Sequence, residues 1–232
     1  MYQQHLLRWK VKRRLQKMEL NSLSLDREEV CIKGKRLYVY RPARLEDVFQ
    51  GDPFLEAHRF PFWVMIWPAS LVLAEYLASL PPPLDILEVG AGLGIPSLFA
   101  SSFGHRVLAT DKEELPLKLL KRSAEEQGLE LSVQILDWLN PKLEKQFDVI
   151  AGAEVVIKSS LFEPLFNLFK SYLKPEGEII LAHERERKRT LVPFLVRAEK
   201  HFKVETKLVR LRDEEKVIEI VLNRLTLKIS EG

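Results

Sequence analysis

The chain has 232 residues and a hydrophobic content of 46%, which suits one α/β domain with an N-terminal extension and leaves little room for two full domains. The net charge is only +3 although 30% of the residues are charged, so the overall charge does not indicate nucleic-acid binding, and any basic surface must be local. The single cysteine, Cys31, excludes an intramolecular disulfide framework and a metal site built from several thiolates, and it favours the cell interior.

Residues 1–20 predict a basic amphipathic helix, because apolar residues fall at roughly helical spacing with Lys and Arg between them. Three interpretations are open for it: a helix docked on the domain with a solvated basic face, a contact with RNA, a ribosome or an acidic protein, or binding to a membrane surface. The first 30 residues lack the apolar core of a signal peptide, and no run of about 18 apolar residues suggests a membrane span. We therefore expect a soluble, cytoplasmic protein.

Two features precede the main α/β pattern. Segments 29–32 and 36–40 predict a β-hairpin, and residues 42–62 are expected to be irregular. An aromatic block from Phe62 to Trp67 then leads into a helix that stops at the prolines 81–83. Trp67 and its neighbours either pack in the core or wall a ligand pocket, where an aromatic face suits a cation.

Residues 84–94, which read Leu-Asp-Ile-Leu-Glu-Val-Gly-Ala-Gly-Leu-Gly, predict a strand that breaks into a ligand-holding turn. The apolar residues suit a strand of a parallel sheet that is covered on both faces. Gly90, Gly92 and Gly94 let the backbone approach a ligand and lead into a helix that begins near Ile95. A dinucleotide fingerprint would have its third glycine where Ile95 stands. A tight strand-to-helix turn without a ligand is the alternative.

Beyond this turn, strands and helices alternate as in the βα units of a doubly wound sheet. The expected strands are 106–110, 131–136, 147–156 and 177–182, and the expected helices are 113–127, 161–172 and 190–202. The last two strands, 203–211 and 216–225, are joined by a turn too short for a crossover helix, so they must pair antiparallel. The sequence predicts a Rossmann-like α/β sheet of seven strands, mostly parallel, with a C-terminal antiparallel hairpin. We expect residues 1–66 to form an N-terminal extension and residues 67–232 to form the main domain.

Acidic residues stand at the strand ends, where ligands bind in an open α/β sheet. The first four strands of the pattern end in Glu88, Asp111, Asp137 and Glu154, and His183-Glu184 follow the fifth. Each alone could be a helix cap or a core contact, but crowded carboxylates repel one another, and a cationic, hydroxyl-rich ligand would relieve them. Asp111 is placed for the two hydroxyls of a ribose. Asp137 and Trp138 are placed for an adenine amine and ring.

These motifs resemble those of the class I, seven-β-strand methyltransferases that use S-adenosylmethionine (SAM). Within that class they resemble methyltransferase family 16, whose characterised members mostly methylate lysines of other proteins. The likeness covers about residues 30–225 and includes Trp67-Pro68-Ala69-Ser70, Glu88 to Gly94, Asp111, Asp137-Trp138, Glu154 to Ile157 and Glu184-Arg185. It implies SAM as the methyl donor, S-adenosylhomocysteine as the product, and no metal. The implied cofactor site consists of Trp67, Glu88, Gly90, Gly92, Gly94, Asp111, Lys112, Asp137, Trp138 and Glu154.

The acceptor side is expected at Glu154, with His183 and Glu184 as further catalytic residues. Where the family has D-x-x-Y after the fourth strand, this chain has Glu154 and Ile157, so the acid is longer and the tyrosine hydroxyl is absent. A lysine acceptor must lose a proton, which costs about 4.6 kcal/mol at pH 7. Methylation of a cytosine carbon would need a cysteine nucleophile, but Cys31 lies in the predicted N-terminal hairpin.

We therefore expect a SAM-dependent methyltransferase that modifies a protein side chain, with lysine as the acceptor. Two alternatives remain open. A small-molecule or RNA methyltransferase is favoured if the basic N-terminal helix contacts nucleic acid. A non-catalytic SAM-binding protein is permitted by the departure at Glu154 and Ile157.

Overall fold

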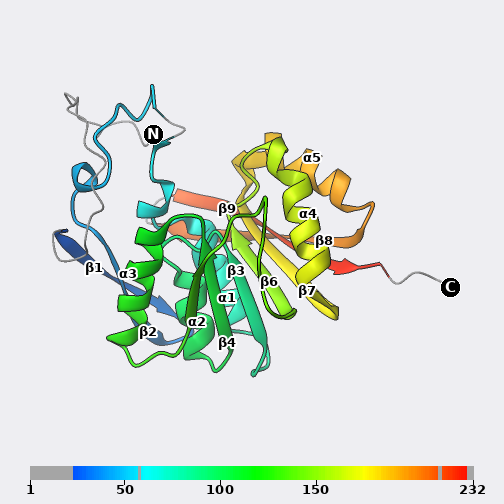
Figure 1. The fold of residues 1–232 in the computed structure, drawn as a ribbon, viewed down its shortest axis with the longest axis horizontal. Helices are drawn as coiled ribbons and strands as arrows, with labels where there is room; N and C mark the ends of the chain where they lie inside the picture. The colour runs from blue at the N-terminus through cyan, green and yellow to red at the C-terminus, as the bar shows by residue number, and fades with distance from the viewer. Residues whose placement is uncertain (1–22, 57–58, 214–215, 229–232) are drawn as a thin grey trace.

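The computed structural model describes residues 23–56, 59–213 and 216–228. The predicted basic helix at residues 1–20 lies outside the described residues. The described chain forms a two-stranded hairpin and a seven-stranded sheet with helices on both faces (Figure 1). In these three segments, no helix combines the length and apolar character that a bilayer crossing requires.

The N-terminal hairpin is confirmed, with longer strands than the sequence predicted. Strand β1 (Leu25–Ile32) pairs antiparallel with β2 (Lys35–Pro42). Lys33 and Gly34 form the two-residue turn with φ values of 49° and 79°, the left-handed conformation that tight hairpins of this kind require. The buried side chains of the hairpin join a hydrophobic cluster with residues of helices α2 (Ile95–Ser102) and α3 (Glu114–Glu125).

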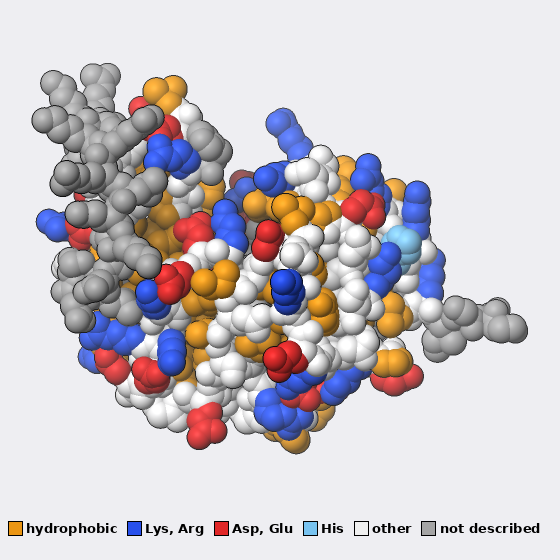
Figure 2. All heavy atoms as spheres, in the orientation of Figure 1, with side chains coloured by type: hydrophobic (Ala, Val, Ile, Leu, Met, Phe, Trp, Pro, Cys, Tyr) orange, Lys and Arg blue, Asp and Glu red, His pale blue; other side chains and the backbone are white. Residues whose placement is uncertain are grey.

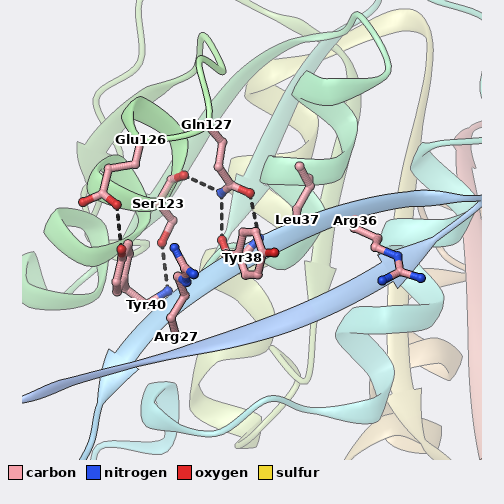
Figure 3. Close-up of a pocket in the computed structure, with 8 residues that line it drawn as sticks. All are labelled: Arg27, Arg36, Leu37, Tyr38, Tyr40, Ser123, Glu126 and Gln127. Carbon is pink, nitrogen blue, oxygen red and sulfur yellow. Dashed lines mark hydrogen bonds between the residues drawn. The ribbon is translucent and has the colours of Figure 1, made fainter.

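Side chains from α3 and the turn after it cover the free edge of β2 (Figure 3). Gln127 Oε1 accepts a hydrogen bond from the Tyr38 N–H at 2.7 Å, and its Nε2 donates to the Tyr38 carbonyl at 2.8 Å. The Tyr40 N–H donates to Ser123 Oγ at 3.0 Å. The Gln127 amide thus pairs with Tyr38 as a neighbouring strand would, which protects an edge that could otherwise pair with another chain. A hollow of about 360 Å³ is bordered by these residues and by Arg27 and Arg36.

The seven strands of the main sheet lie in the order β5-β4-β3-β6-β7-β9-β8 (Figure 1). The five parallel strands are β3 (Asp85–Val89), β4 (Arg106–Asp111), β5 (Ser132–Ile135), β6 (Phe147–Ala153) and β7 (Leu173–Glu184). Strands β8 (Phe202–Asp213) and β9 (Lys216–Leu227) pair antiparallel, as predicted. Strand β3 pairs with β4 on one side and β6 on the other, so the strand order reverses there. Open α/β sheets bind ligands at the carboxyl ends of such strands.

Helices cover both faces of the sheet. Ile86 and Val149 on one face pack with α1 (Pro68–Leu77). Leu87 and Ile150 on the other face pack with α4 (Phe162–Tyr172) and α5 (Lys188–Ala198), which lie together in Figure 1.

The predicted helix at 190–202 was wrong at its C-terminal end. Helix α5 ends at Ala198, and Phe202 instead begins β8. Phe202 is fully buried in the cluster that contains Phe166 and Phe169 of α4. An apolar residue at this position suits either a helix or a strand, and in the structure Phe202 both pairs with Leu227 of β9 and packs against α4.

Candidate active site

The glycine turn after β3 has the backbone that the sequence predicted. Gly90, Gly92 and Gly94 have φ values of 63°, 52° and 69°, which residues with a Cβ rarely adopt. A Cβ at Gly90 would come within 3.1 Å of Val155 and 3.3 Å of the Trp138 ring, and one at Gly92 would lie 3.4 Å from Trp63. The turn is therefore closely bordered by two tryptophans, and Gly94 begins α2.

Asp111 ends β4 and fixes this turn. Its Oδ2 accepts a hydrogen bond from the Gly92 N–H at 2.9 Å, and its Oδ1 accepts one from the Glu113 N–H at 3.0 Å. Each carboxylate oxygen retains capacity for a second hydrogen bond. Burial raises the pKa of Asp111, and the two backbone donors oppose that change. The carboxylate is therefore held in place with acceptor capacity left for a ligand.

Glu88 lies in the buried part of β3 and contacts α2. Its Oε2 accepts a hydrogen bond from the Ser97 N–H at 3.0 Å and one from the Ser97 hydroxyl. Burial raises the pKa of Glu88 to about 8, more than the Ser97 hydrogen bonds lower it. In this structure Glu88 thus holds the turn against the first turn of α2.

Glu154 follows β6, directly across the switch point from the glycine turn. It has a φ of 55°, a left-handed conformation that is unusual for a residue with a side chain. Its Oε1 accepts a hydrogen bond from the Glu184 N–H at 2.6 Å. Its Oε2 is buried and has no hydrogen-bond partner among the described residues. Burial raises the pKa of Glu154 to about 7, while the Glu184 N–H and the charge of Arg187 act in the opposite direction.

His183 supports the segment that carries Glu154. The imidazole is fully buried, and its Nε2 accepts a hydrogen bond from the Val156 N–H at 3.1 Å. Burial lowers the pKa of His183 to about 3, so the ring is neutral at physiological pH. This geometry favours a positioning role over direct proton transfer. Glu184 is half-buried, and burial raises its pKa.

Arg187 joins this group, although no sequence motif pointed to it. It ends the single turn η6 (Arg185–Arg187) between β7 and α5. Its Nε lies 3.2 Å from Glu154 Oε2, and its guanidinium lies 5.5 Å from the centroid of the Trp67 ring. The Trp67 Nε1–H donates to the Phe62 carbonyl at 3.0 Å. Tertiary structure therefore brings the aromatic block and the segment after β7 together.

The other predicted site residues are more exposed. Asp137 is exposed beyond the end of β5, where its Oδ1 accepts a hydrogen bond from the Leu139 N–H at 2.9 Å. Lys112 is exposed and its Nζ lies 3.7 Å from Glu113. Trp138 is half-buried beside Gly90. The sequence did not single out Trp63, whose Nε1–H donates to Glu113 at 2.9 Å.

The surface around η6 and α5 is rich in cations. Figure 2 shows Lys and Arg side chains beside hydrophobic ones in the region where Figure 1 places α4 and α5. The exposed cations that follow β7 are Arg185, Lys188 and Arg189. Arg185 pairs with Glu219 of β9.

Comparison with known proteins identifies relatives of this chain. The protein-lysine methyltransferase METTL21E of Mus musculus is 33% identical over 135 residues, which cover 52% of this chain and 55% of that protein. The histone-arginine methyltransferase METTL23 of Rattus norvegicus is 29% identical over 149 residues, covering 57% of this chain and 64% of that protein. The matched region thus spans less than two thirds of the length of these relatives.

Solved structures share the fold at low identity. The 16S rRNA N2 G1207 methyltransferase RsmC of T. thermophilus, solved with AdoMet and guanosine, has a TM-score of 0.63 at 19% identity and covers 91% of this chain and 52% of that one. A ribosomal protein L11 methylase from Lactobacillus delbrueckii has a TM-score of 0.55 at 20% identity and covers 71% and 81%. The family model described as lysine methyltransferase matches residues 62–202, more than half of the chain. The chain therefore belongs to the lysine methyltransferase family.

Proposed function

We propose that this protein transfers the methyl group of SAM to a lysine side chain of another protein. Its family supports the reaction class. The observation that carries the proposal is the glycine turn at the switch point of the sheet, held by the buried Asp111 carboxylate through the Gly92 N–H. Relatives named as protein-lysine methyltransferases support a protein substrate.

The residues around the glycine turn fit SAM. The three glycines of the turn carry no Cβ, so a ligand can approach their backbone, and Asp111 has acceptor capacity for ribose hydroxyls. Trp138 beside Gly90 is suited to stack on an adenine, and the exposed Asp137 to accept from its amine. We assign Glu88 to supporting the turn through Ser97, and Lys112 to the outer rim of the site. When bound, SAM would supply an electrophilic methyl group on a sulfonium.

Glu154 is the acceptor-side residue in this proposal. Its buried Oε2 is suited to accept a hydrogen bond from an ammonium group and to orient the amine nitrogen toward the methyl carbon. Because burial raises the pKa of Glu154 to about 7, this carboxylate is also a stronger base than an ordinary glutamate. A proton would pass from the ammonium to Glu154, which would free the nitrogen lone pair that methyl transfer requires. His183 and the Glu184 N–H would hold Glu154 in its left-handed conformation.

Arginine is a second candidate acceptor. Relatives named histone-arginine methyltransferases match this chain, and the structure itself places a guanidinium, that of Arg187, beside Glu154. An RNA or ribosome contact through residues 1–20, outside the described chain, stays a prediction. We further propose a cytoplasmic location, which the single cysteine supports.

Calorimetry with SAM, S-adenosylhomocysteine and NAD tests the cofactor. We expect the first two to bind and NAD to bind negligibly. Asp111→Ala should weaken SAM binding by about 1.5–3 kcal/mol, the value of hydrogen bonds to a charged group. Asp26→Ala, an exposed carboxylate on β1, is the control and should leave the affinity unchanged. Equal SAM affinity in a folded Asp111→Ala variant would contradict the assigned ribose contact.

Methyl transfer is tested with isotopically labelled SAM, a cell lysate and mass spectrometry of the products. A labelled lysine or arginine side chain would identify the acceptor, whereas labelled RNA or a labelled metabolite would favour the alternative methyltransferases. Binding of SAM without any labelled product would favour a non-catalytic SAM-binding protein. With the identified substrate, Glu154→Gln should keep SAM affinity and lower the single-turnover rate.

A further inference from the structure

Arg187 occupies a site that is chemically suited to a cation from outside the protein. Two groups form this site: the Oε2 atom of Glu154, 3.2 Å from the Arg187 Nε, and the face of Trp67, 5.5 Å from the guanidinium. A protonated lysine or an arginine side chain interacts favourably with both a carboxylate and an aromatic face. Arg187 comes from η6, so the occupant belongs to the same chain.

The contacts of Arg187 are those of a displaceable occupant. Its side chain is 40% exposed although that of Glu154 is only 7% exposed. The distance between Nε and Oε2 suits an ion pair, but Oε2 lacks a hydrogen bond from any described residue. The other oxygen of Glu154, by contrast, is fixed by the Glu184 N–H at 2.6 Å. One oxygen is thus anchored, and the other is left for a better donor.

We propose that Glu154 and Trp67 form the binding site for the cationic acceptor side chain, and that Arg187 fills this site until the substrate displaces it. This inference rests on the proposed function for the source of the cation, a lysine or arginine of the protein substrate. Arg187 acts as an intramolecular competitor and makes the site selective for cations that can replace a guanidinium. Rotation of one side chain, which is anchored in a single turn between β7 and α5, would open the site.

The size of the effect follows from the contacts that displacement breaks. The ion pair with Glu154 is partly exposed and the cation–π contact is exposed, and both kinds of contact are weak, so part of the protein has the site open without a substrate. Because a competing occupant reduces the apparent affinity in proportion to the fraction of open sites, removal of Arg187 should strengthen binding of the acceptor about five- to tenfold.

The test is an NMR titration of the Trp67 indole N–H signal, assigned with Trp67→Phe, in the full chain saturated with S-adenosylhomocysteine. The probes are N-acetyl-lysine methylamide, N-acetyl-arginine methylamide and the uncharged N-acetyl-methionine methylamide. A pH of about 8.5 is chosen because it lies above the pKa of about 7 of Glu154 in the wild type, and removal of the neighbouring guanidinium raises that pKa. Arg187→Gln is compared with Arg185→Gln, the same substitution two residues earlier on a side chain that pairs with Glu219 instead.

We expect Arg187→Gln to lower the apparent Kd of at least one cationic probe about five- to tenfold, and Arg185→Gln to change it less than twofold. The uncharged probe should bind no better to either variant. Arg187→Lys keeps the charge but not the planar guanidinium, so it should give an intermediate Kd, and it takes the place of Arg187→Gln if that variant does not fold.

Three results would overturn the inference. The first is unchanged or weaker cation binding in the folded Arg187 variants, and the second is an equal gain in affinity for the uncharged probe. The third is a gain in SAM affinity without a gain in affinity for the cationic probes. The last result would mean that Arg187 competes with the sulfonium. SAM binding and labelled transfer by the wild type are measured separately. Their loss would remove the proposed function, whereas their presence with a failed titration would remove only this inference.

Discussion

Two carboxyl groups on strand β3 have different surroundings. At the amino edge of the main sheet, Asp85 is surrounded by cations. Near the carboxyl edge, the hydrogen bonds to Glu88 from the described residues come from Ser97. Asp85 accepts hydrogen bonds from Arg106 at 2.9 and 3.0 Å and from Lys145 at 2.7 Å. The hydrogen bond from Arg106 is the main reason that the pKa of Asp85 is lowered. Burial raises the pKa of Glu88 to about 8. Two carboxyl groups three residues apart therefore have their pKa values shifted in opposite directions.

This difference separates an edge whose carboxylates are paired with cations from the edge at which we propose that the cofactor and the acceptor bind. Carboxylates paired with cations stabilise the fold at neutral pH, and Lys174 extends the amino-edge network by bonding Asp148 at 2.9 Å. Glu88, Asp111 and Glu154 are instead buried, and desolvation raises the pKa of each. Groups with perturbed pKa values in such positions are typical of functional sites.

The largest expected effect concerns the backbone of the carboxyl edge. Gly94→Ala should destabilise the protein by about 3 kcal/mol, because its φ is 69° and the new Cβ would run into the Leu120 side chain. Gly34→Ala is the matched control, since its φ is 79° but its Cβ would meet nothing within 4 Å, and it should cost about 1 kcal/mol. Urea unfolding measures both. Equal losses would show that conformation alone, and not packing of α2 on α3, constrains the turn.

Glu88→Gln should remove the pH dependence that Glu88 imposes on the stability of the protein. The pKa of Glu88 in the folded protein, about 8, exceeds that of an unfolded chain, about 4.3, so its stabilising contribution is present at low pH and is lost as the pH rises from about 4 to 8. The glutamine cannot ionise and can still accept from the Ser97 N–H. We expect the variant to exceed the wild type by at least about 2 kcal/mol at pH 8 and to match it near pH 4. A difference that does not change with pH would argue against a buried, neutral Glu88.

Asp85→Asn should show the opposite pH dependence at the amino edge. The pKa of Asp85 is lowered below its unfolded value, so its contribution is present above about pH 4 and is lost as the pH falls toward the folded value. Arg106 and Lys145 are more than half exposed and Lys174 is 37% exposed, so the expected loss at pH 7 is only about 1–2 kcal/mol. Thermal or urea unfolding at pH 7 and pH 3 should show the gap between variant and wild type narrowing in acid.

The smallest effect is expected for Lys145→Gln, which removes one of the cations around Asp85. Its side chain is 54% exposed, so the loss should be about 0.5 kcal/mol and should vanish in about 1 M salt. Lys142→Gln, a neighbouring lysine for which no ion pair with a described residue is found, is the control. A salt-independent loss above about 1 kcal/mol would mean that Lys145 stabilises the edge through packing on Phe147 instead.

Local patterns determined most of the fold. The buried strand before Gly90 and the alternating βα units each follow from contacts between residues close in sequence, and all of them are found in the structure. The short turn between the last two strands left only antiparallel pairing, which is observed. The sequence also placed Asp111 at the end of a strand beside the glycine turn, because carboxyl ends of parallel strands meet at one edge.

Tertiary structure decided how the strand-end residues differ from one another. Asp111 and Asp137 look alike in the sequence, yet one is buried against the glycine turn and the other is exposed beyond β5. Glu154 takes a left-handed conformation that no nearby residue predicts, and His183 accepts from the Val156 N–H across 27 positions of the chain. The contact of Arg187 with Trp67 joins residues that are 120 positions apart in the chain. Such contacts depend on how the strands and helices pack, and residue spacing within one segment carries no information about them.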